Sequence, residues 1–340
     1  MIIDFRSDTV TKPTKLMLEA MMNATVGDDV FGDDHTVNKL QDIAAKLFNK
    51  EAALFCPSGT MANQIAIKIH TNSPGEVICD ELAHVYKYEG GGIGFNSGLA
   101  TKLLKGEKGR LTAELIESAL NPDDIHFPST QLVCLENTCN KGGGSIYDLE
   151  EIKKISKLCK DKSLKLHLDG ARIFNAIVES NYTSHEIGKQ CDTISVCLSK
   201  GLGAPIGSLL IGNTDDIKKA KRIRKILGGG MRQAGYLAAA GIYALENNVN
   251  RLKDDHQRAK LLANDLNKLS WIKEVFPVYT NILIIEVQPD LELNNIIQIL
   301  SQHKILVAAF GSQQIRFVTH LDIDDEMIDR TIERLKKITF

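Results

Sequence analysis

The residue with the clearest chemical potential is Lys200, which follows the apolar run "TISVCLS" and precedes Gly201 and Gly203. A run of this composition is typical of an interior strand, so we expect the lysine at its end to lie at the mouth of a sheet, partly desolvated. A partly desolvated amine is a nucleophile suited to Schiff-base chemistry. A solvated lysine at a turn remains the alternative. The glycines follow the lysine, so the stretch is not a G-x-x-x-x-G-K-[ST] phosphate loop.

Asp169 ends the preceding expected strand, in "LHLDGAR", with Arg172 on the same turn. A carboxylate in that place can hold a proton on a heteroaromatic nitrogen, which a pyridoxal ring needs in order to act as an electron sink. The alternative is a simple turn former or helix cap. Together Lys200 and Asp169 favour a pyridoxal-type site.

Three small or polar residues, Ser58, Gly59 and Thr60, open an expected helix in "CPSGTMAN". The N-terminus of a helix presents free N–H groups and the positive end of the helix dipole, which suits a phosphate. An ordinary helix cap has the same sequence, so the motif gains weight only beside Lys200 and Asp169.

Three further candidates stand in distinctive surroundings. His84 precedes the loop "EGGGIG" and can stack on a flat cofactor or move protons, unless it is an ordinary hydrogen-bonded loop histidine. If Ile315 and Phe317 face a core, Arg316 faces the opposite way, toward an interdomain cleft where a guanidinium suits a substrate carboxylate. The alternative is a surface arginine. Arg232, in "GGGMRQAG", belongs to a loop that reaches a phosphate, across a subunit interface, or to a flexible hinge.

Apolar strands alternate with amphipathic helices over the first two thirds of the chain. This order predicts an α/β fold with a mostly parallel sheet covered by helices on both faces, and ligands bind beyond the carboxyl ends of such strands. After Gly235 a long helical stretch, expected to break near 247–250, leads to a few strands and two helices. We therefore expect a large domain over residues 1–247, including an N-terminal substrate-site segment, and a small α+β domain over 248–340.

The composition excludes several classes of protein. The 340 residues carry a net charge of -2, which gives no electrostatic argument for nucleic acid or an anionic membrane as a partner. No apolar run approaches the roughly 20 residues of a membrane span, and the charged N-terminus does not look like a signal peptide. A cytoplasmic protein is expected. Seven cysteines without C-x-x-C, and nine histidines without H-x-x-x-H, predict neither disulfides nor a metal site.

The ordered set of motifs resembles the low-specificity L-threonine aldolases, which are pyridoxal-phosphate enzymes of the aspartate-aminotransferase-like fold (fold type I). The resemblance runs nearly from end to end. Its stretches are "FRSDTVTKPT", "VGDDVFGDDHTVNKLQ", "SGTMAN", "LENTCN", "LHLDGARIFNA", "CLSKGLGAPIGSLLIG", "GGGMRQAGYLAAAGIYAL" and "RFVTHLD". It implies a tetramer, a dimer of dimers, with sites at the dimer interface.

The resemblance also implies a role for each matching residue. Lys200 would hold the cofactor, Asp169 its ring nitrogen, and His84 would stack over the ring. The phosphate would be bound by Ser58, Gly59 and Thr60, together with Arg232 and Lys225 from a neighbouring subunit. The substrate carboxylate would be bound by Ser7, Arg172 and Arg316, with Arg172 also close to the cofactor. Tyr88 would contact the rest of the substrate, and His126 would lie near its hydroxyl.

The function implied is reversible cleavage of L-threonine or L-allo-threonine to glycine and acetaldehyde. His84, His126 or a bound water are alternatives for the base that removes the β-hydroxyl proton. Two positions depart from the family pattern, Cys139 in place of a histidine and Tyr88 in place of a phenylalanine, so the threo or allo preference stays open. The alternatives are a β-eliminating lyase or aminotransferase of the same fold, and a catalytically silent protein.

Overall fold

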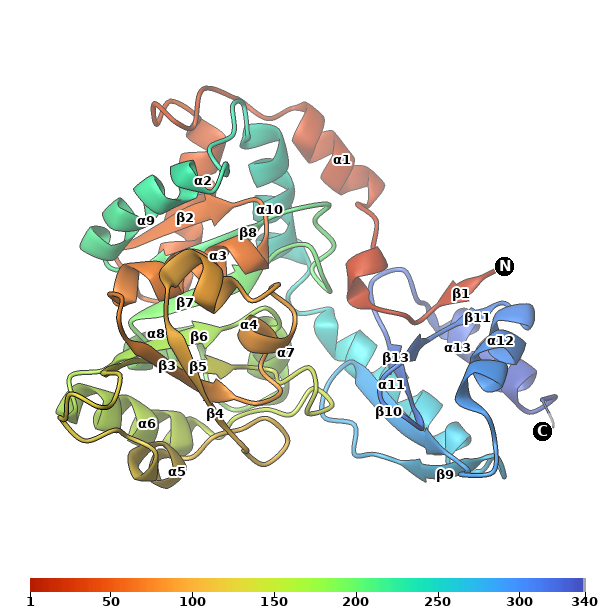
Figure 1. Cartoon of the computed structure of the whole chain (residues 1–340). Coiled ribbons are helices and arrows are strands. Elements are labelled where there is room, and N and C mark those ends of the chain that lie inside the picture. Colours follow the sequence, from red (N-terminus) through yellow and green to blue (C-terminus); the bar gives the residue numbers. More distant parts are fainter. Residues whose placement is uncertain (339–340) are drawn as a thin grey trace.

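The computed structural model of the chain describes residues 1–338 and divides into a large and a small unit (Figure 1). The large unit contains a seven-stranded sheet in the order β2-β8-β7-β6-β5-β3-β4, in which β8 is antiparallel to both neighbours and the other strands are parallel. The strands are β2 (Ala52–Cys56), β3 (Glu76–Asp80), β4 (Ala100–Leu104), β5 (Thr130–Glu136), β6 (Lys165–Asp169), β7 (Thr193–Cys197) and β8 (Ser208–Gly212). The prediction of a mostly parallel sheet is confirmed.

Helices cover both faces of this sheet. The helices of the large unit are α1 (Lys15–Met22), α2 (His35–Leu47), α3 (Gly59–His70), α4 (His84–Lys87), α5 (Ala113–Ser118), α6 (Leu149–Asp161), α7 (Ile173–Glu179), α8 (Ser184–Gln190), α9 (Thr214–Ile226) and α10 (Gly235–Asn247), with short turns η1 (Asp8–Val10) and η2 (Ile93–Ser97). Side chains of a strand alternate between faces. On β2, Ala53 and Phe55 accordingly pack in the core that contains α2, whereas Leu54 and Cys56 pack against α3 and α9.

The small unit is built on an antiparallel sheet in the order β12-β13-β10-β9, covered by three helices. Its elements are α11 (Leu252–Leu266), β9 (Ile272–Val275), β10 (Ile282–Val287), α12 (Leu293–Gln302), β11 (Ile305–Leu306), β12 (Ala308–Ala309), β13 (Gln314–Val318) and α13 (Asp325–Leu335). The helical stretch after Gly235 breaks between α10 and α11, as its sequence suggested. None of the helices within residues 1–338 combines the length and apolar character needed to cross a membrane.

The first residues of the chain belong to the small unit, which corrects the expected assignment of residues 1–247 to one domain. The strand β1 (Ile3–Asp4) pairs in parallel with β11, and Ile3 and Phe5 are buried in the core of the small unit. The ring of Phe5 lies 5.8 Å from that of Phe317. A strand of two residues carries no periodicity, so the sequence held no signal for this placement. The chain then crosses to the large unit through η1.

Candidate active site

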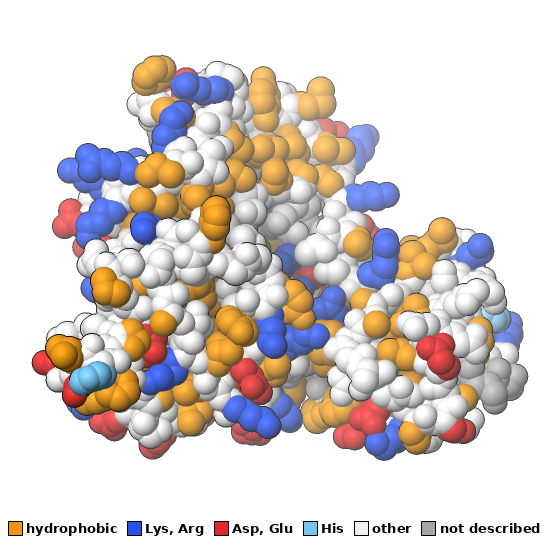
Figure 2. Space-filling view, in the orientation of Figure 1, with side chains coloured by type: hydrophobic (Ala, Val, Ile, Leu, Met, Phe, Trp, Pro, Cys, Tyr) orange, Lys and Arg blue, Asp and Glu red, His pale blue; other side chains and the backbone are white. Residues whose placement is uncertain are grey.

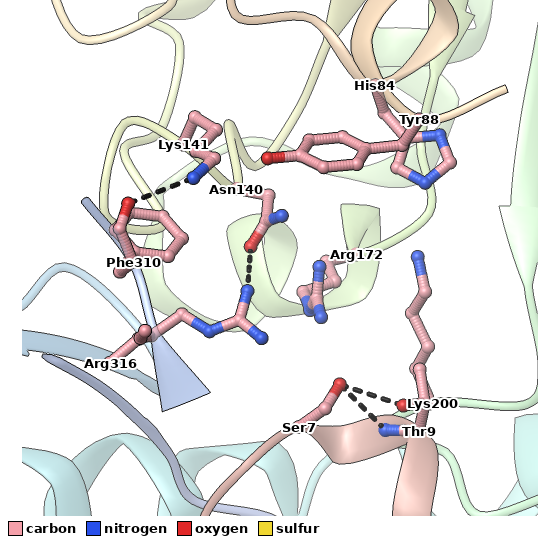
Figure 3. Close-up of a pocket in the computed structure, with 11 residues that line it drawn as sticks. Ser7, Thr9, His84, Tyr88, Asn140, Lys141, Arg172, Lys200, Phe310 and Arg316 are labelled. Carbon is pink, nitrogen blue, oxygen red and sulfur yellow. Dashed lines mark hydrogen bonds between the residues drawn. The ribbon is translucent and has the colours of Figure 1, made fainter. Parts of the chain in front are cut away.

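A cavity of about 330 Å³ lies where the carboxyl ends of the parallel strands face the small unit (Figure 3). It contains six of the residues expected from the sequence and five others. Its lining consists of Ser7, Thr9, His84, Tyr88, Asn140, Lys141, Arg172, Lys200, Ala309, Phe310 and Arg316. Residues from the N-terminal segment, from the small unit and from the segments that follow four strands of the large sheet therefore meet in one place.

Lys200 is held at the cavity by the tight turn that follows β7. The N–H of Gly203 donates to the carbonyl oxygen of Lys200 at 2.8 Å, and Gly203 adopts a φ of +79° that favours glycine. Thr11 Oγ1 donates to the same carbonyl oxygen at 3.1 Å. The side chain is half-buried, and its ammonium points toward the ring of His84 (Figure 3). This placement is the one that a lysine-bound cofactor requires.

Arg172 is buried and already paired. Its Nε and Nη2 donate to the two carboxylate oxygens of Asp8 at 2.7 and 2.6 Å. Burial alone would raise the pKa of Asp8, but the charge and hydrogen bonds of Arg172 hold that pKa far below its usual value. Arg172 therefore reaches the cavity as an anchored cation whose charge Asp8 largely compensates.

Arg316, on β13, is in the opposite electrostatic state. Its Nη1 donates to Asn140 Oδ1 at 2.8 Å and its Nη2 to the carbonyl oxygen of Arg6 at 2.9 Å, whereas its buried Nε has no hydrogen-bond partner within residues 1–338. Burial and the nearby charge of Arg172 lower the pKa of Arg316 to about 10. A cation that faces a cavity without a carboxylate is a binding site for the carboxylate of a ligand.

His84 begins α4, where its N–H donates to Glu136 Oε2 at 2.8 Å. Its Nδ1 lies 2.9 Å from Glu89 Oε1, and its ring lies 5.7 Å from that of Tyr88. Burial would lower the pKa of His84, but the hydrogen bond to Glu89 and the charge of Asp169 outweigh it and raise this pKa. A proton held on Nδ1 by Glu89 leaves Nε2 as the ring nitrogen that acts on a ligand.

Two further carboxyl groups stand behind the cavity. Asp169 is almost fully buried; its Oδ2 accepts from Asn63 Nδ2 at 2.8 Å and its Oδ1 from the N–H of Ala171 at 3.1 Å. Burial and the charge of Asp169 raise the pKa of Glu136 to about 7. Ligand atoms of His84, Glu89 and Asp169 lie within 4.8 Å of one another, but Asn63 donates to both carboxylates and closes the group with hydrogen bonds.

The turn Ser58–Thr60 lies beside the cavity and not in its lining. Ser58 caps α3 by accepting from the N–H of Met61 at 3.2 Å, and Ser58 and Thr60 are exposed. A Cβ atom on Gly59 would lie 2.6 Å from the Sγ of Cys197, the last residue of β7, so only glycine lets the helix start this close to the Lys200 turn. Free N–H groups of a helix so placed fit a phosphate.

His126 does not line the cavity of its own chain, so its expected place near the substrate stays a prediction. Its exposed side chain pairs with Asp124 at 2.7 Å, in the loop that precedes β5. The cavity lies beyond the carboxyl end of β5, and a strand of seven residues separates the two edges of the sheet by roughly 20 Å. His126 was matched through the family resemblance alone, without a strand end to place it.

Lys225 and Arg232 also lie outside the lining of the cavity. Lys225 is in the last turn of α9. Arg232 forms an ion pair with Asp28 and lies over the ring of Phe31, 5.7 Å from its centroid. Their contribution to the site of a neighbouring subunit stays a prediction.

Several residues of the site were missed from the sequence. Asn140, Lys141 and Phe310 line the cavity, and Asp8, Asn63, Glu89 and Glu136 orient those that do. Asn140 follows the end of β5 in "LENTCN", a position that could have identified it. Of the two departures from the family pattern, Tyr88 lines the cavity. Cys139 is buried behind it, and its Sγ donates to the carbonyl oxygen of Glu136 at 2.9 Å.

The parts of the site fit one cofactor. The lysine, the buried acid beside the histidine ring, and the glycine-dependent helix start correspond to the aldehyde, ring nitrogen and phosphate of pyridoxal phosphate. The unpaired Arg316 adds a place for the carboxylate of an amino acid. The fold and the site together define a pyridoxal-phosphate-dependent enzyme.

Comparisons with known proteins narrow this class. The model of the beta-eliminating lyase family matches residues 4–290, and the chain belongs to that family. It is 45% identical over 328 residues to "Low specificity L-threonine aldolase" of Escherichia coli strain K12, covering 96% of each chain. It is 43% identical to "Low-specificity L-threonine aldolase 1" of Arabidopsis thaliana, covering 97% of this chain and 94% of that protein.

Solved structures share the fold at lower identity. The threonine aldolase of Leishmania major matches with a TM-score of 0.84 at 24% identity, covering 98% of both chains. The ornithine aminotransferase of Toxoplasma gondii ME49 matches with a TM-score of 0.72 at 19% identity, covering 99% of this chain and 85% of that one. These similarities support the architecture described above.

Proposed function

We propose that the protein reversibly cleaves L-threonine and L-allo-threonine to glycine and acetaldehyde with pyridoxal phosphate as its cofactor. The observation that carries this proposal is Arg316, a half-buried guanidinium without a carboxylate partner within residues 1–338, beside Lys200 in one cavity. The names of the relatives that share 43–45% of their residues with this chain support the choice of reaction.

Each residue of the cavity has a task in this reaction. Arg316 binds the substrate carboxylate, with Ser7 and the anchored Arg172 beside it. Lys200 holds the cofactor and releases it to the substrate amine. The cofactor, when bound, supplies the electron sink for the bond that breaks.

Two residues of the site hold or accept protons during the reaction. Asp169 holds a proton on the ring nitrogen of the cofactor from its buried position. Nε2 of His84 takes the proton of the β-hydroxyl group, because Glu89 keeps the other proton on Nδ1. His126 lies on the far edge of the sheet from the cavity of its own chain, so His84 and a bound water are the two alternatives for this base that one chain supplies.

Mixing the holoenzyme with L-threonine and with L-allo-threonine tests this proposal. We expect acetaldehyde and glycine in equal amounts, no turnover in Lys200→Ala, and normal turnover in the exposed control Lys46→Ala. Formation of a 2-oxo acid and ammonia would instead identify a β-eliminating activity. Substantial activity in Lys200→Ala would remove Lys200 from its role.

We also propose that the site is completed by a second copy of the chain, in a dimer that pairs into a tetramer. Exposed apolar side chains gather on the upper part of the large unit (Figure 2), where Figure 1 shows α1 and α10. Met22 on α1 and Tyr236 on α10 are exposed, as is Phe31 in the loop before α2. Arg232 lies against Phe31 on the same face. Burial of this face against a partner would bring Arg232 and Lys225 toward the exposed phosphate turn of the other subunit.

The mass of Phe31→Asp in solution, measured by light scattering, tests this interface. We expect smaller particles and weaker pyridoxal phosphate binding, because a carboxylate in an apolar interface opposes assembly and the turn loses its partner cations. Phe127→Asp, a change at another exposed phenylalanine far from this face, is the control. An unchanged mass for Phe31→Asp would show that subunits meet elsewhere.

We place the protein in the cytoplasm. All seven cysteines are free and buried, which suits a reducing compartment.

A further inference from the structure

A chain of hydrogen bonds runs from the two carboxylates of the site into the large unit. Asn63, on α3, donates through Nδ2 to Asp169 Oδ2 and to Glu89 Oε1, both at 2.8 Å. Its Oδ1 lies 2.7 Å from Ser195 Oγ and 3.1 Å from His167 Nε2. One buried side-chain amide therefore touches the acid assigned to the cofactor and the acid that holds His84.

The chain continues on the far side of His167. The Nδ1 of His167 lies 3.0 Å from Thr193 Oγ1, and that oxygen lies 3.0 Å from Nε2 of His70, the last residue of α3. We call Asn63, His167, Thr193 and His70 the Asn63 relay. His167 and Thr193 are fully buried, so each contact replaces one with water.

The direction of every hydrogen bond in the Asn63 relay follows from its carboxylate end. Ionised carboxylates only accept, so the nitrogen of the Asn63 amide faces them and its oxygen must accept from His167 Nε2–H. Burial lowers the pKa of His167 to about 4, so its ring is neutral and Nδ1 accepts from the hydroxyl of Thr193. Thr193 has one hydroxyl proton, so its oxygen accepts from His70 Nε2–H.

We propose that Asn63 is a positioning residue for the reaction, and that the rest of the Asn63 relay holds its amide with the NH₂ group toward Asp169 and Glu89. The two N–H bonds then orient both carboxylates, the first toward the ring nitrogen of the cofactor and the second toward Nδ1 of His84. The inference rests on the cofactor proposed above and not on which amino acid is cleaved.

A reversed amide would place the Asn63 oxygen against two carboxylates. That arrangement raises the free energy of the ionised acids and weakens their hold on the cofactor and on His84. Thr193 opposes the reversal from a distance. When His70 Nε2–H donates to the Thr193 oxygen, the hydroxyl proton of Thr193 is directed to His167 Nδ1, which favours the proton of His167 on Nε2. Thr193 itself does not line the cavity, so a change there reaches the site only through the relay.

The test compares Thr193→Val with Thr193→Ser. Valine keeps the shape and removes the hydroxyl, whereas serine keeps the hydroxyl and is the matched control. We expect pyridoxal phosphate to dissociate about 5- to 10-fold more readily from Thr193→Val, the loss of about one buried hydrogen bond, and within about 2-fold of the parent value from Thr193→Ser.

The second readout is the ¹⁵N spectrum of histidine-labelled apoprotein in the solid state, with the signals of His167 assigned by a His167→Asn variant. We expect one neutral Nε2–H form in the parent and in Thr193→Ser, and a mixture of forms in Thr193→Val. Equal spectra and equal cofactor affinity in Thr193→Val and the parent would overturn the proposal, as would a serine variant as weak as the valine one.

Asn63→Leu tests the amide directly. We expect this variant to lose affinity for pyridoxal phosphate, and an affinity equal to that of the parent would contradict the proposal. If that variant does not fold, the Thr193 pair still decides. A protein that bound no pyridoxal phosphate would end the proposed function, while the spectrum of the apoprotein would still report whether the relay has the inferred direction.

Discussion

Two arginines of the same cavity differ in what surrounds them. Arg172 has a carboxylate in bidentate contact, whereas the partners of Arg316 within residues 1–338 are an amide oxygen and a carbonyl oxygen. Desolvation of a cation is unfavourable unless an anion approaches it. The binding of one carboxylate beside Arg316 would therefore offset the unfavourable desolvation of its cation.

Arg316→Ala should raise KM for L-threonine by about 10- to 100-fold, because it removes a charge-assisted contact worth roughly 1.5–3 kcal/mol. The value of kcat should change less, and the free energy of unfolding should not fall, since an uncompensated buried cation is lost. Steady-state kinetics and urea unfolding measure both effects. Arg330→Ala, on the surface of α13, is the control. An unchanged KM would exclude Arg316 from carboxylate binding.

At this scale the sequence predicted the residues that stand at the ends of strongly patterned strands, Lys200 and Asp169, and the outward-facing Arg316. It did not predict Asn63 or Glu89, because their importance comes from partners that only the fold brings near. His126 is absent from the cavity of its own chain for a related reason, since a residue before a strand lies at the opposite edge of the sheet from one after it.

At the scale of the element, the carboxyl ends of β5 and β6 bring Glu136 and Asp169 side by side, in register. The register of the two parallel strands brings two carboxyl groups next to each other, and burial strengthens the repulsion between their negative charges. The raised pKa of Glu136 is the result. The pattern of strands was readable from the sequence, but the register that sets Glu136 opposite Asp169 was not.

The stability of the apoprotein should therefore depend on Glu136. An acid whose pKa rises from 4.5 to about 7 on folding stabilises the protein fully below the lower value, and this contribution is lost as pH rises through the upper one. Between pH 5.5 and 8 the parent should lose about 2 kcal/mol from this group, and Glu136→Gln should not. Urea unfolding at the two pH values measures the difference, with exposed Glu117→Gln as control. Equal slopes in parent and Glu136→Gln would contradict this account.

At the scale of the whole molecule, the N-terminal segment joins the two units. It pairs with the small unit through β1 and with the large one through Asp8 and Arg172, and it lends Ser7 and Thr9 to the cavity. The sequence predicted a large unit and a small C-terminal one. It did not show that the segment changes units, because nothing in ten residues reveals a partner 300 residues away.

Phe5→Ala should destabilise the small unit by about 3–5 kcal/mol, although the residue lies at the other end of the chain, because it leaves a cavity beside Phe317. Hydrogen exchange followed by mass spectrometry should show that β10 and β13 exchange faster in Phe5→Ala than the same strands do in the parent protein. Phe55→Ala, in the core of the large unit, should instead affect peptides around β2. Equal loss of protection in both units for Phe5→Ala would refute the assignment of Phe5.

The pairing of β1 with β11 also sets an order of events on the ribosome. Ile3 is made about 15–60 s before its partner Ile305, at 5–20 residues per second. The last strand of the large sheet ends at Gly212, so this sheet can form while β1 is still without its partner strand. Ser7 and Arg316 consequently meet only after the strands of the large sheet have been made, and a nascent chain acquires its carboxylate pocket later than that sheet.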